Sequence, residues 1–153
     1  MEITEVDEPV RTALVVRRVV RMDEVPEFLG EAFGRCAGAA ATLHKEIGGA
    51  PFAWYHGAPT TSLDVSAGLP VEYLTGELPI GVEAVERPGG RAVTAVHVGP
   101  YDTLHDTYEA VESWMEERGL VAGDDAWEEY LTDPVAQPDQ SKWETRIVLP
   151  LTS

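Results

Sequence analysis

Hydrophobic residues recur three and four positions apart in two stretches of the chain, a spacing that predicts amphipathic helices. The first helix is expected from about Asp23 to Ile47, with Asp23 as its N-cap and Pro26 in its first turn, where proline is tolerated. Its apolar positions are Val25, Phe28, Leu29, Phe33, Cys36, Ala40, Leu43 and Ile47. The pair Gly48-Gly49 follows this stripe and is expected to end the helix.

The second helix is expected from about Asp102 to Arg118, with Gly119 as its C-terminal stop. Its apolar stripe is Leu104, Tyr108, Val111 and Met115. Segments rich in β-branched or alternating residues predict strands at 10–20, 51–57, 63–72, 80–86, 91–98, 126–132 and 142–151. Pro-Gly-Gly at 88–90 predicts a turn between two of these strands, and the tip of a hairpin is one interpretation of it.

The order strand, helix, strand, strand occurs twice, at about 10–72 and 91–152. Both halves end alike, in Gly68-Leu69-Pro70-Val71 and in Val148-Leu149-Pro150-Leu151, and both carry a Trp and a Tyr in the strand after the helix. Repetition of one unit suggests that neither half buries its apolar surface alone. We therefore expect residues 1–153 to form a single domain with an internal duplication.

A duplicated unit of this kind predicts an α+β fold, with an antiparallel sheet and the two main helices packed on one face. The opposite face would be curved and open near the pseudo-twofold axis. Pockets for small molecules form preferentially between repeats or domains, so a ligand cleft is expected on that face.

The charge of the chain limits its partners. With 11 Lys and Arg against 27 Asp and Glu, the net charge is -16, so the protein is expected to repel nucleic acids and anionic membranes and to attract cations. The acidic N-terminus lacks the order of a secretory signal, and no apolar run is long enough to span a membrane. With a single cysteine as well, a cytoplasmic location is expected.

Several common catalytic patterns are absent. There is no Gly-rich phosphate loop, no G-x-S-x-G motif and no C-x-x-C pair, and no cofactor is expected. The histidines His44, His56, His97 and His105 lack the spacing of metal ligands, so no metal site is expected and each is interpreted as a surface or satisfied core residue. Cys36 lies on an apolar stripe, which favours an inert buried thiol over a nucleophile.

The segment Trp127-Glu128-Glu129-Tyr130 is the most informative polar cluster. Strand alternation places Glu128 with Tyr130 on one face and Glu129 with Trp127 on the other. A carboxylate ringed by aromatics on the face opposite the helices would have a raised pKa and would attract a cation. The alternative is that both acids are solvated on an outer strand, and the residues alone do not decide which acid would face a ligand.

Four further aromatic residues are candidates to line the same cleft: Trp54, Tyr55, Tyr101 and Trp143. Each could instead belong to the core. Tyr101 ends the run His97-Val98-Gly99-Pro100-Tyr101, in which a strand passes through a Gly-Pro turn into a helix. At that position it could present its hydroxyl at a cleft mouth or pack against the start of the helix.

At these residues the chain resembles the gyrase-inhibitor-like (GyrI-like) small-molecule-binding superfamily, which includes the effector-binding domains of AraC-type and MerR-type regulators. The shared motifs are Gly99-Pro100-Tyr101, Trp114, Glu128-Glu129-Tyr130, Asp133-Pro134 and the final strand from Thr145 to Pro150. In the first half, Pro51, Tyr55-His56-Gly57 and Gly68-Leu69-Pro70-Val71 match as well. The resemblance covers nearly the whole chain, and Trp54 and Glu129 depart from it.

The resemblance implies a small organic ligand in a cleft between the repeats. In multidrug-sensing relatives an acidic residue among aromatics takes up bulky compounds, often cations, and the matching residues here are Glu128 and Tyr130. Some relatives hydrolyse strained cyclopropane rings in the same cleft, with acidic and aromatic groups. The resemblance thus leaves two functions, binding for sensing or sequestration and ring-opening hydrolysis by Glu128 and Tyr130.

A third function is that of an acidic protein-interaction module, such as a gyrase inhibitor with a protein partner. The helix-turn-helix of the regulators has no counterpart in the sequence, so a complete transcription regulator is not expected. Neither the ligand nor the oligomeric state follows from the residues.

Overall fold

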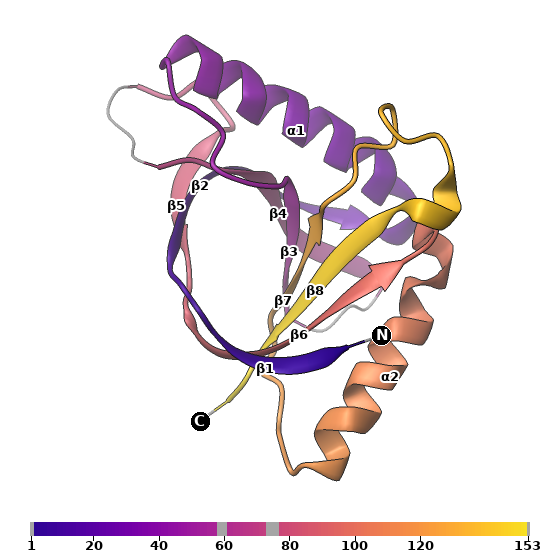
Figure 1. Cartoon of the computed structure of the whole chain (residues 1–153). Coiled ribbons are helices and arrows are strands. Elements are labelled where there is room, and N and C mark those ends of the chain that lie inside the picture. Colours follow the sequence, from indigo (N-terminus) through magenta and orange to yellow (C-terminus); the bar gives the residue numbers. More distant parts are fainter. Residues whose placement is uncertain (1, 58–60, 73–76, 153) are drawn as a thin grey trace.

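The computed structural model describes residues 2–57, 61–72 and 77–152. Within them, eight strands form one antiparallel sheet in the order β1-β6-β8-β7-β3-β4-β2-β5. The strands are β1 (Ile3–Glu8), β2 (Arg11–Arg21), β3 (Phe52–His56), β4 (Ser62–Pro70), β5 (Glu83–Arg87), β6 (Gly90–Val98), β7 (Ala126–Tyr130) and β8 (Glu144–Pro150). The two main helices are α1 (Val25–Thr42) and α2 (Leu104–Glu117), and Figure 1 shows both outside a strongly curled sheet.

The predicted α+β class and the repeated order of elements are confirmed. Strands and helices follow one another as β2-α1-β3-β4 and again as β6-α2-β7-β8, and β3 pairs with β7 where the two halves meet. The outer strands link the halves further: β1 precedes β2 but pairs with β6, and β5 precedes β6 but pairs with β2. The two halves therefore share one continuous sheet.

The prediction for the first helix was wrong at both ends. Asp23 lies in a 3-10 turn, Met22–Glu24, rather than at an N-cap, and the structure shows its carboxylate paired with Arg21. The α-helix ends at Thr42 instead of Ile47, because His44 adopts a left-handed conformation with φ 57°. The helix thus ends six residues before Gly48.

The second helix follows the prediction more closely. It is preceded by a 3-10 turn, Tyr101–Thr103, and it ends at Glu117. Gly119 has φ 67°, and the Leu120 amide donates to the Met115 carbonyl at 3.0 Å, so Gly119 is the C-terminal stop that its position predicted.

Strand β1 was not among the predicted elements. Its sequence, ITEVDE, is acidic and resembles a solvated tail, yet it pairs along its whole length with β6. The interpretation of 88–90 as a hairpin tip was also wrong, because β5 and β6 do not pair with each other. Gly89 instead passes so close to the β1–β2 connection that an added Cβ would lie 2.5 Å from the Glu8 carbonyl oxygen.

Apolar side chains fill both faces of the sheet. One cluster packs under α1 and includes Phe28, Cys36 and Val65, and a second packs under α2 and includes Val111 and Ile147. Smaller clusters occupy the concave face, around Val15 and Phe52 and around Trp127 and Val148. Cys36 is fully buried, as its place on the stripe predicted, and burial raises the pKa of its thiol to about 11.

Candidate functional site

Glu128 and Glu129 are adjacent on β7, and their side chains point to opposite faces of the sheet, as strand alternation requires. Glu128 is in register with Ala53 and Ile147, which belong to the clusters under the helices. Glu129 is in register with Phe52, which packs on the concave face. The two carboxylates therefore occupy different environments.

The Glu128 side chain is enclosed by tyrosines. The residue is 8% exposed, Tyr108 of α2 donates its hydroxyl to Oε2 at 2.7 Å, and Tyr130 donates to Oε1 at 2.8 Å. The bond from α2 places Glu128 on the face that carries the helices. The expectation of a carboxylate among aromatics on the opposite face is thus wrong for Glu128, because the register turns this side of β7 toward α2.

Burial dominates the electrostatics of Glu128. It raises the pKa of this carboxyl, because ionisation in a poorly solvated site is unfavourable, and the hydrogen bonds from Tyr108 and Tyr130 and the nearby His97 oppose the rise. Among the described residues, no Arg or Lys forms an ion pair with Glu128. Of the groups that the structure describes, only neutral hydroxyl groups and His97 stabilise its negative charge.

The tyrosines beside Glu128 are held in the protonated form. Burial and the charge of Glu128 raise the pKa of Tyr108 and of Tyr130 well above the ordinary value, and burial does the same for Tyr55. Tyr55 and Tyr130 also interact through their hydroxyl groups. These hydroxyls are consequently hydrogen-bond donors, and not anions, throughout the physiological pH range.

Further aromatic rings extend from Tyr130 to the surface. The Tyr101 ring lies edge-on to Tyr130 at 5.7 Å between centroids and packs against Trp143 at 4.9 Å, and Phe33 of α1 lies 6.1 Å from Tyr130. Tyr101 is 38% exposed, whereas Glu128 is nearly covered. We call Glu128, Tyr55, Tyr101, Tyr108, Tyr130 and Trp143 the tyrosine–glutamate cluster.

His97 connects the elements that carry this cluster. Its Nδ1 lies 2.7 Å from the Thr107 hydroxyl on α2, and its Nε2 lies 3.0 Å from the Pro100 carbonyl oxygen. His97 thereby ties β6 to the turn that carries Tyr101. It is a satisfied core histidine, as the sequence suggested, but it also contributes to the electrostatics of Glu128.

The structure brings together five of the six predicted ligand-binding residues, namely Glu128, Tyr130, Tyr101, Tyr55 and Trp143. Trp54 lies apart from them, on the concave face, where its indole N–H donates to Asp125 at 3.3 Å. Sequence reasoning placed Tyr108 only in the apolar stripe of a helix. A buried tyrosine in such a stripe usually needs a hydrogen-bond partner for its hydroxyl, and this requirement could have indicated Tyr108 as a site residue.

Glu129 contrasts with Glu128 because cations surround it. Arg87 donates to its Oε2 at 3.1 Å, Arg146 donates to Oε1 at 2.9 Å, and the Trp127 indole N–H lies 3.3 Å from Oε2. Arg146 also pairs with Glu8 of β1. The chain of ion pairs from Arg87 through Glu129 and Arg146 to Glu8 ties β5, β7, β8 and β1 together, and we call it the concave-face network.

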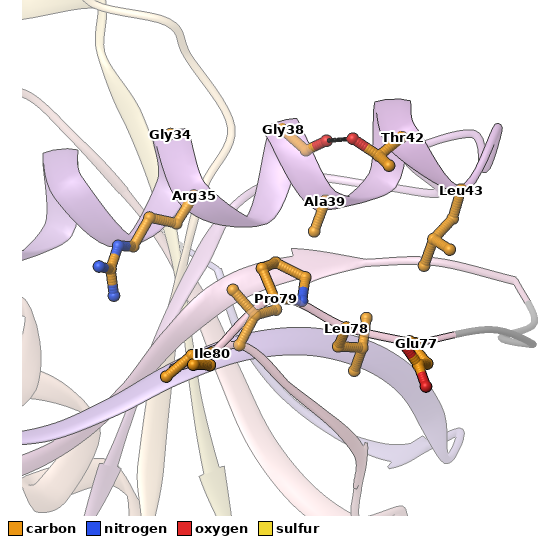
Figure 2. A pocket seen from close by; sticks show the side chains of 11 residues that line it. Gly34, Arg35, Gly38, Ala39, Thr42, Leu43, Glu77, Leu78, Pro79 and Ile80 are labelled. Atoms are coloured by element: carbon orange, nitrogen blue, oxygen red, sulfur yellow. Dashed lines mark hydrogen bonds between the residues drawn. The ribbon is translucent and has the colours of Figure 1, made fainter.

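A separate groove lies between α1 and segment 77–82. It has a volume of about 590 Å³, and Figure 2 shows Ala39 and Leu43 of the helix facing Leu78 and Pro79 of the segment. Arg35 and Glu77 supply its charged groups. It contains none of the predicted site residues.

Within the described ranges, no three His, Cys, Asp or Glu side chains cluster in a way that could hold a metal ion. None of the described helices is both long enough and apolar enough to cross a membrane.

The family model of the GyrI-like small molecule binding domain matches residues 1–152, so the chain belongs to the GyrI-like family. No curated protein matches the sequence. The chain is similar in structure to the C-terminal domain of EcmrR, with a TM-score of 0.86, 19% identity and coverage of 99% of this chain and 98% of that one. In a complex of EcmrR with DNA it covers 57% of the longer chain, at 20% identity and a TM-score of 0.82.

Two further structures have the same fold. A hydrolase from Listeria innocua has a TM-score of 0.68 and 17% identity, with coverage of 99% of this chain and 92% of that one. SAV2435, solved with bound tetraphenylphosphonium, has a TM-score of 0.70 and 11% identity, with coverage of 100% of this chain and 95% of that one. The family match supports small-molecule binding by this chain in general terms.

Proposed function

We propose that the tyrosine–glutamate cluster binds a small aromatic or amphipathic organic cation, for sensing or sequestration. The observation that carries this proposal is the buried Glu128 carboxylate, which accepts two tyrosine hydrogen bonds and has no Arg or Lys partner among the described residues. A bound cation would supply the missing positive charge. SAV2435, which has the same fold, was solved with such a cation.

Three physical effects favour a cation over a neutral ligand at this position. Coulomb attraction to Glu128 is stronger in a poorly solvated site than in water. The rings of Tyr101, Tyr130 and Trp143 would each add cation–π attraction of about 0.5–2 kcal/mol. The net charge of -16 raises the local concentration of cations around the whole molecule.

Entry of the ligand requires movement of side chains. Glu128 is 8% exposed, and the partly exposed Tyr101 lies over Tyr130, so the Tyr101 ring is the group that we expect to swing aside. Rotation of an aromatic ring at the surface needs no change in the sheet. The Gly99-Pro100 turn, held by His97, would stay in place while the ring moves.

The test is a fluorescence titration with tetraphenylphosphonium and, in parallel, with neutral triphenylphosphine oxide. We expect saturable quenching by the cation and a loss of affinity of at least about tenfold in Glu128→Gln, which corresponds to 1.4 kcal/mol. Glu116→Gln on the exposed side of α2 removes the same charge far from the cluster and is the matched control. Equal affinity of the wild type and Glu128→Gln, or equal binding of the neutral compound, would refute the proposal.

A second candidate function is the hydrolysis of strained electrophilic rings at the same residues. The raised pKa of the Glu128 carboxyl and the protonated hydroxyls of Tyr108 and Tyr130 favour it, because such a pair can activate water and polarise an electrophile. Turnover of a cyclopropane-bearing alkylating agent, lost in Glu128→Gln, would support it. Protection that stops at one equivalent of ligand would instead indicate binding alone.

A further inference from the structure

Three polar side chains on the concave face contact one another in sequence, and none of them belongs to the tyrosine–glutamate cluster. The Ser66 hydroxyl on β4 lies 2.7 Å from His56 Nε2 on β3, and His56 Nδ1 lies 3.6 Å from an oxygen of Asp125, just before β7. Serine, histidine and aspartate are thus connected in the order used by acyl-transfer enzymes, which are recognised by geometry and not by sequence position.

The fold holds each of the three groups in place. Ser66 is directly opposite Trp54 in the β3–β4 register, so it shares the concave face with Trp54 and with His56. The Trp54 ring packs against the His56 ring at 4.3 Å between centroids. Asp125 accepts hydrogen bonds from the Trp54 indole at 3.3 Å and from the Gly57 amide at 3.1 Å, which orients its carboxylate toward the imidazole.

The tautomer of His56 fits the role of a base. A carboxylate beside Nδ1 favours the proton on that nitrogen, which leaves Nε2 free to accept the Ser66 hydroxyl proton. Burial, followed by the charge of Arg17, lowers the pKa of His56 and keeps the imidazole neutral. The 3.6 Å separation from Asp125 exceeds a hydrogen bond, but such contacts commonly shorten when a substrate is bound.

We propose that Ser66, His56 and Asp125 form a second site, which hydrolyses small carboxylic esters. Ser66 Oγ attacks the ester carbonyl carbon while its proton passes to His56 Nε2, and Asp125 stabilises the imidazolium. When the tetrahedral intermediate collapses, the C–O bond to the alcohol breaks and the alcohol leaves with the proton from Nε2. Water then attacks the acyl-serine, with His56 as base, and releases the acid and free Ser66.

Arg17 is placed to stabilise the anionic intermediate. It is directly opposite Ser66 in the β2–β4 register, on the same face, and its guanidinium is held by Asp64 at 2.8 and 3.0 Å. Its side chain is 50% exposed, and that of Asp125 is 38% exposed, so a substrate would approach from their side. Ser66 itself is 3% exposed, which restricts the acyl group to a small one such as acetyl.

The experiment measures hydrolysis of p-nitrophenyl acetate by the full chain and locates the acetyl group by mass spectrometry of peptides from acid-quenched samples. We expect an acetyl group on Ser66 and a loss of rate of at least about tenfold in Ser66→Ala and in His56→Gln. Ser141→Ala, which removes an exposed serine bonded to Asp139, should leave the rate unchanged. Ser66→Ala should keep the wild-type affinity for tetraphenylphosphonium, which separates this proposal from the binding of cations on the other face.

A folding defect in Ser66→Ala would not obscure the result, because Asp125→Asn provides a second readout with the nucleophile intact. This variant should keep its thermal transition and lose at least about tenfold in rate through the wrong histidine tautomer. Acetylation of other residues only, or undiminished rates in folded Ser66→Ala or Asp125→Asn, would overturn the proposal.

Discussion

Glu128 and Glu129 are successive residues of one strand, yet their carboxylates lie in opposite electrostatic environments. Glu129 accepts hydrogen bonds from Arg87 and Arg146, so its charge is compensated inside the fold. Within the described part of the chain, Glu128 accepts hydrogen bonds only from tyrosine hydroxyls, and burial raises the pKa of its carboxyl. The compensated acid is suited to hold strands together, and the uncompensated acid is suited to receive a charge from outside.

The largest effect is expected from breaking the concave-face network. Glu129→Ala would leave the buried Arg87 and the half-buried Arg146 without their shared partner, and loss of one member of a buried pair costs about 3–5 kcal/mol. Urea unfolding should therefore show a large fall in the free energy of unfolding. A loss below about 1 kcal/mol would mean that the network contributes little to the fold.

A smaller effect is expected from weakening the support of Glu128. Tyr108→Phe removes the 2.7 Å hydrogen bond to Oε2, and hydrogen bonds to charged groups are worth about 1.5–3 kcal/mol. The ionised form of Glu128 should lose that stabilisation, so the pKa of its carboxyl should rise further. The pH dependence of tetraphenylphosphonium affinity should shift upward with it, and an unshifted profile would contradict the role given to Tyr108.

The stability of the fold should also depend on the ionisation of Glu128. Because its pKa is raised in the folded state, its contribution to stability is fully present below the unfolded pKa and is lost as pH rises through the folded pKa. Glu128→Gln removes this loss. At high pH the free energy of unfolding of the variant should therefore exceed that of the wild type by about 1.4 kcal/mol for each unit by which the pKa is raised. Thermal unfolding of both proteins at pH 4 and pH 8 measures this difference in stability. A difference between variant and wild type that is no larger at pH 8 than at pH 4 would argue against a buried charge.

The smallest effect is expected at an exposed ion pair. Glu5 Oε2 lies 2.6 Å from Arg91 Nη2, but the two side chains are 36% and 62% exposed. Glu5→Ala should therefore lower the free energy of unfolding by less than about 1 kcal/mol. It is the matched control for Glu129→Ala, since both remove a carboxylate bonded to arginine. A comparable loss in the two variants would show that burial is not what distinguishes them.

The sequence pattern predicted which residues alternate but not which face they would occupy. The period of two separated Glu128 from Glu129 correctly, and it grouped Glu128 with Tyr130. The choice of face depends on how β7 registers with β3 and β8, strands far away in the sequence, and local alternation carries no information about that register. The same limit applies to Trp54, which faces Asp125 instead of Tyr130.

Two errors in the prediction of the fold have identifiable physical causes. The first helix ends early because His44 takes a left-handed conformation, which sequence propensity favours for glycine much more than for histidine. Strand β1 was overlooked because its acidic residues give a poor strand signal, and pairing with β6 from the other half of the chain stabilises it. Non-local pairing overrode local preference in this case.

The most direct test of the account is the titration of Glu128 itself. With glutamate labelled with ¹³C at the carboxyl carbon, NMR can follow each carboxyl through a pH series, and the spectrum of Glu128→Gln assigns the signal of Glu128. We predict that Glu128 titrates above the ordinary range of glutamate, and that saturating tetraphenylphosphonium lowers its pKa because a bound cation favours the charged form. An ordinary pKa for Glu128, or one that tetraphenylphosphonium leaves unchanged, would contradict the claim that this uncompensated carboxylate receives the ligand's charge.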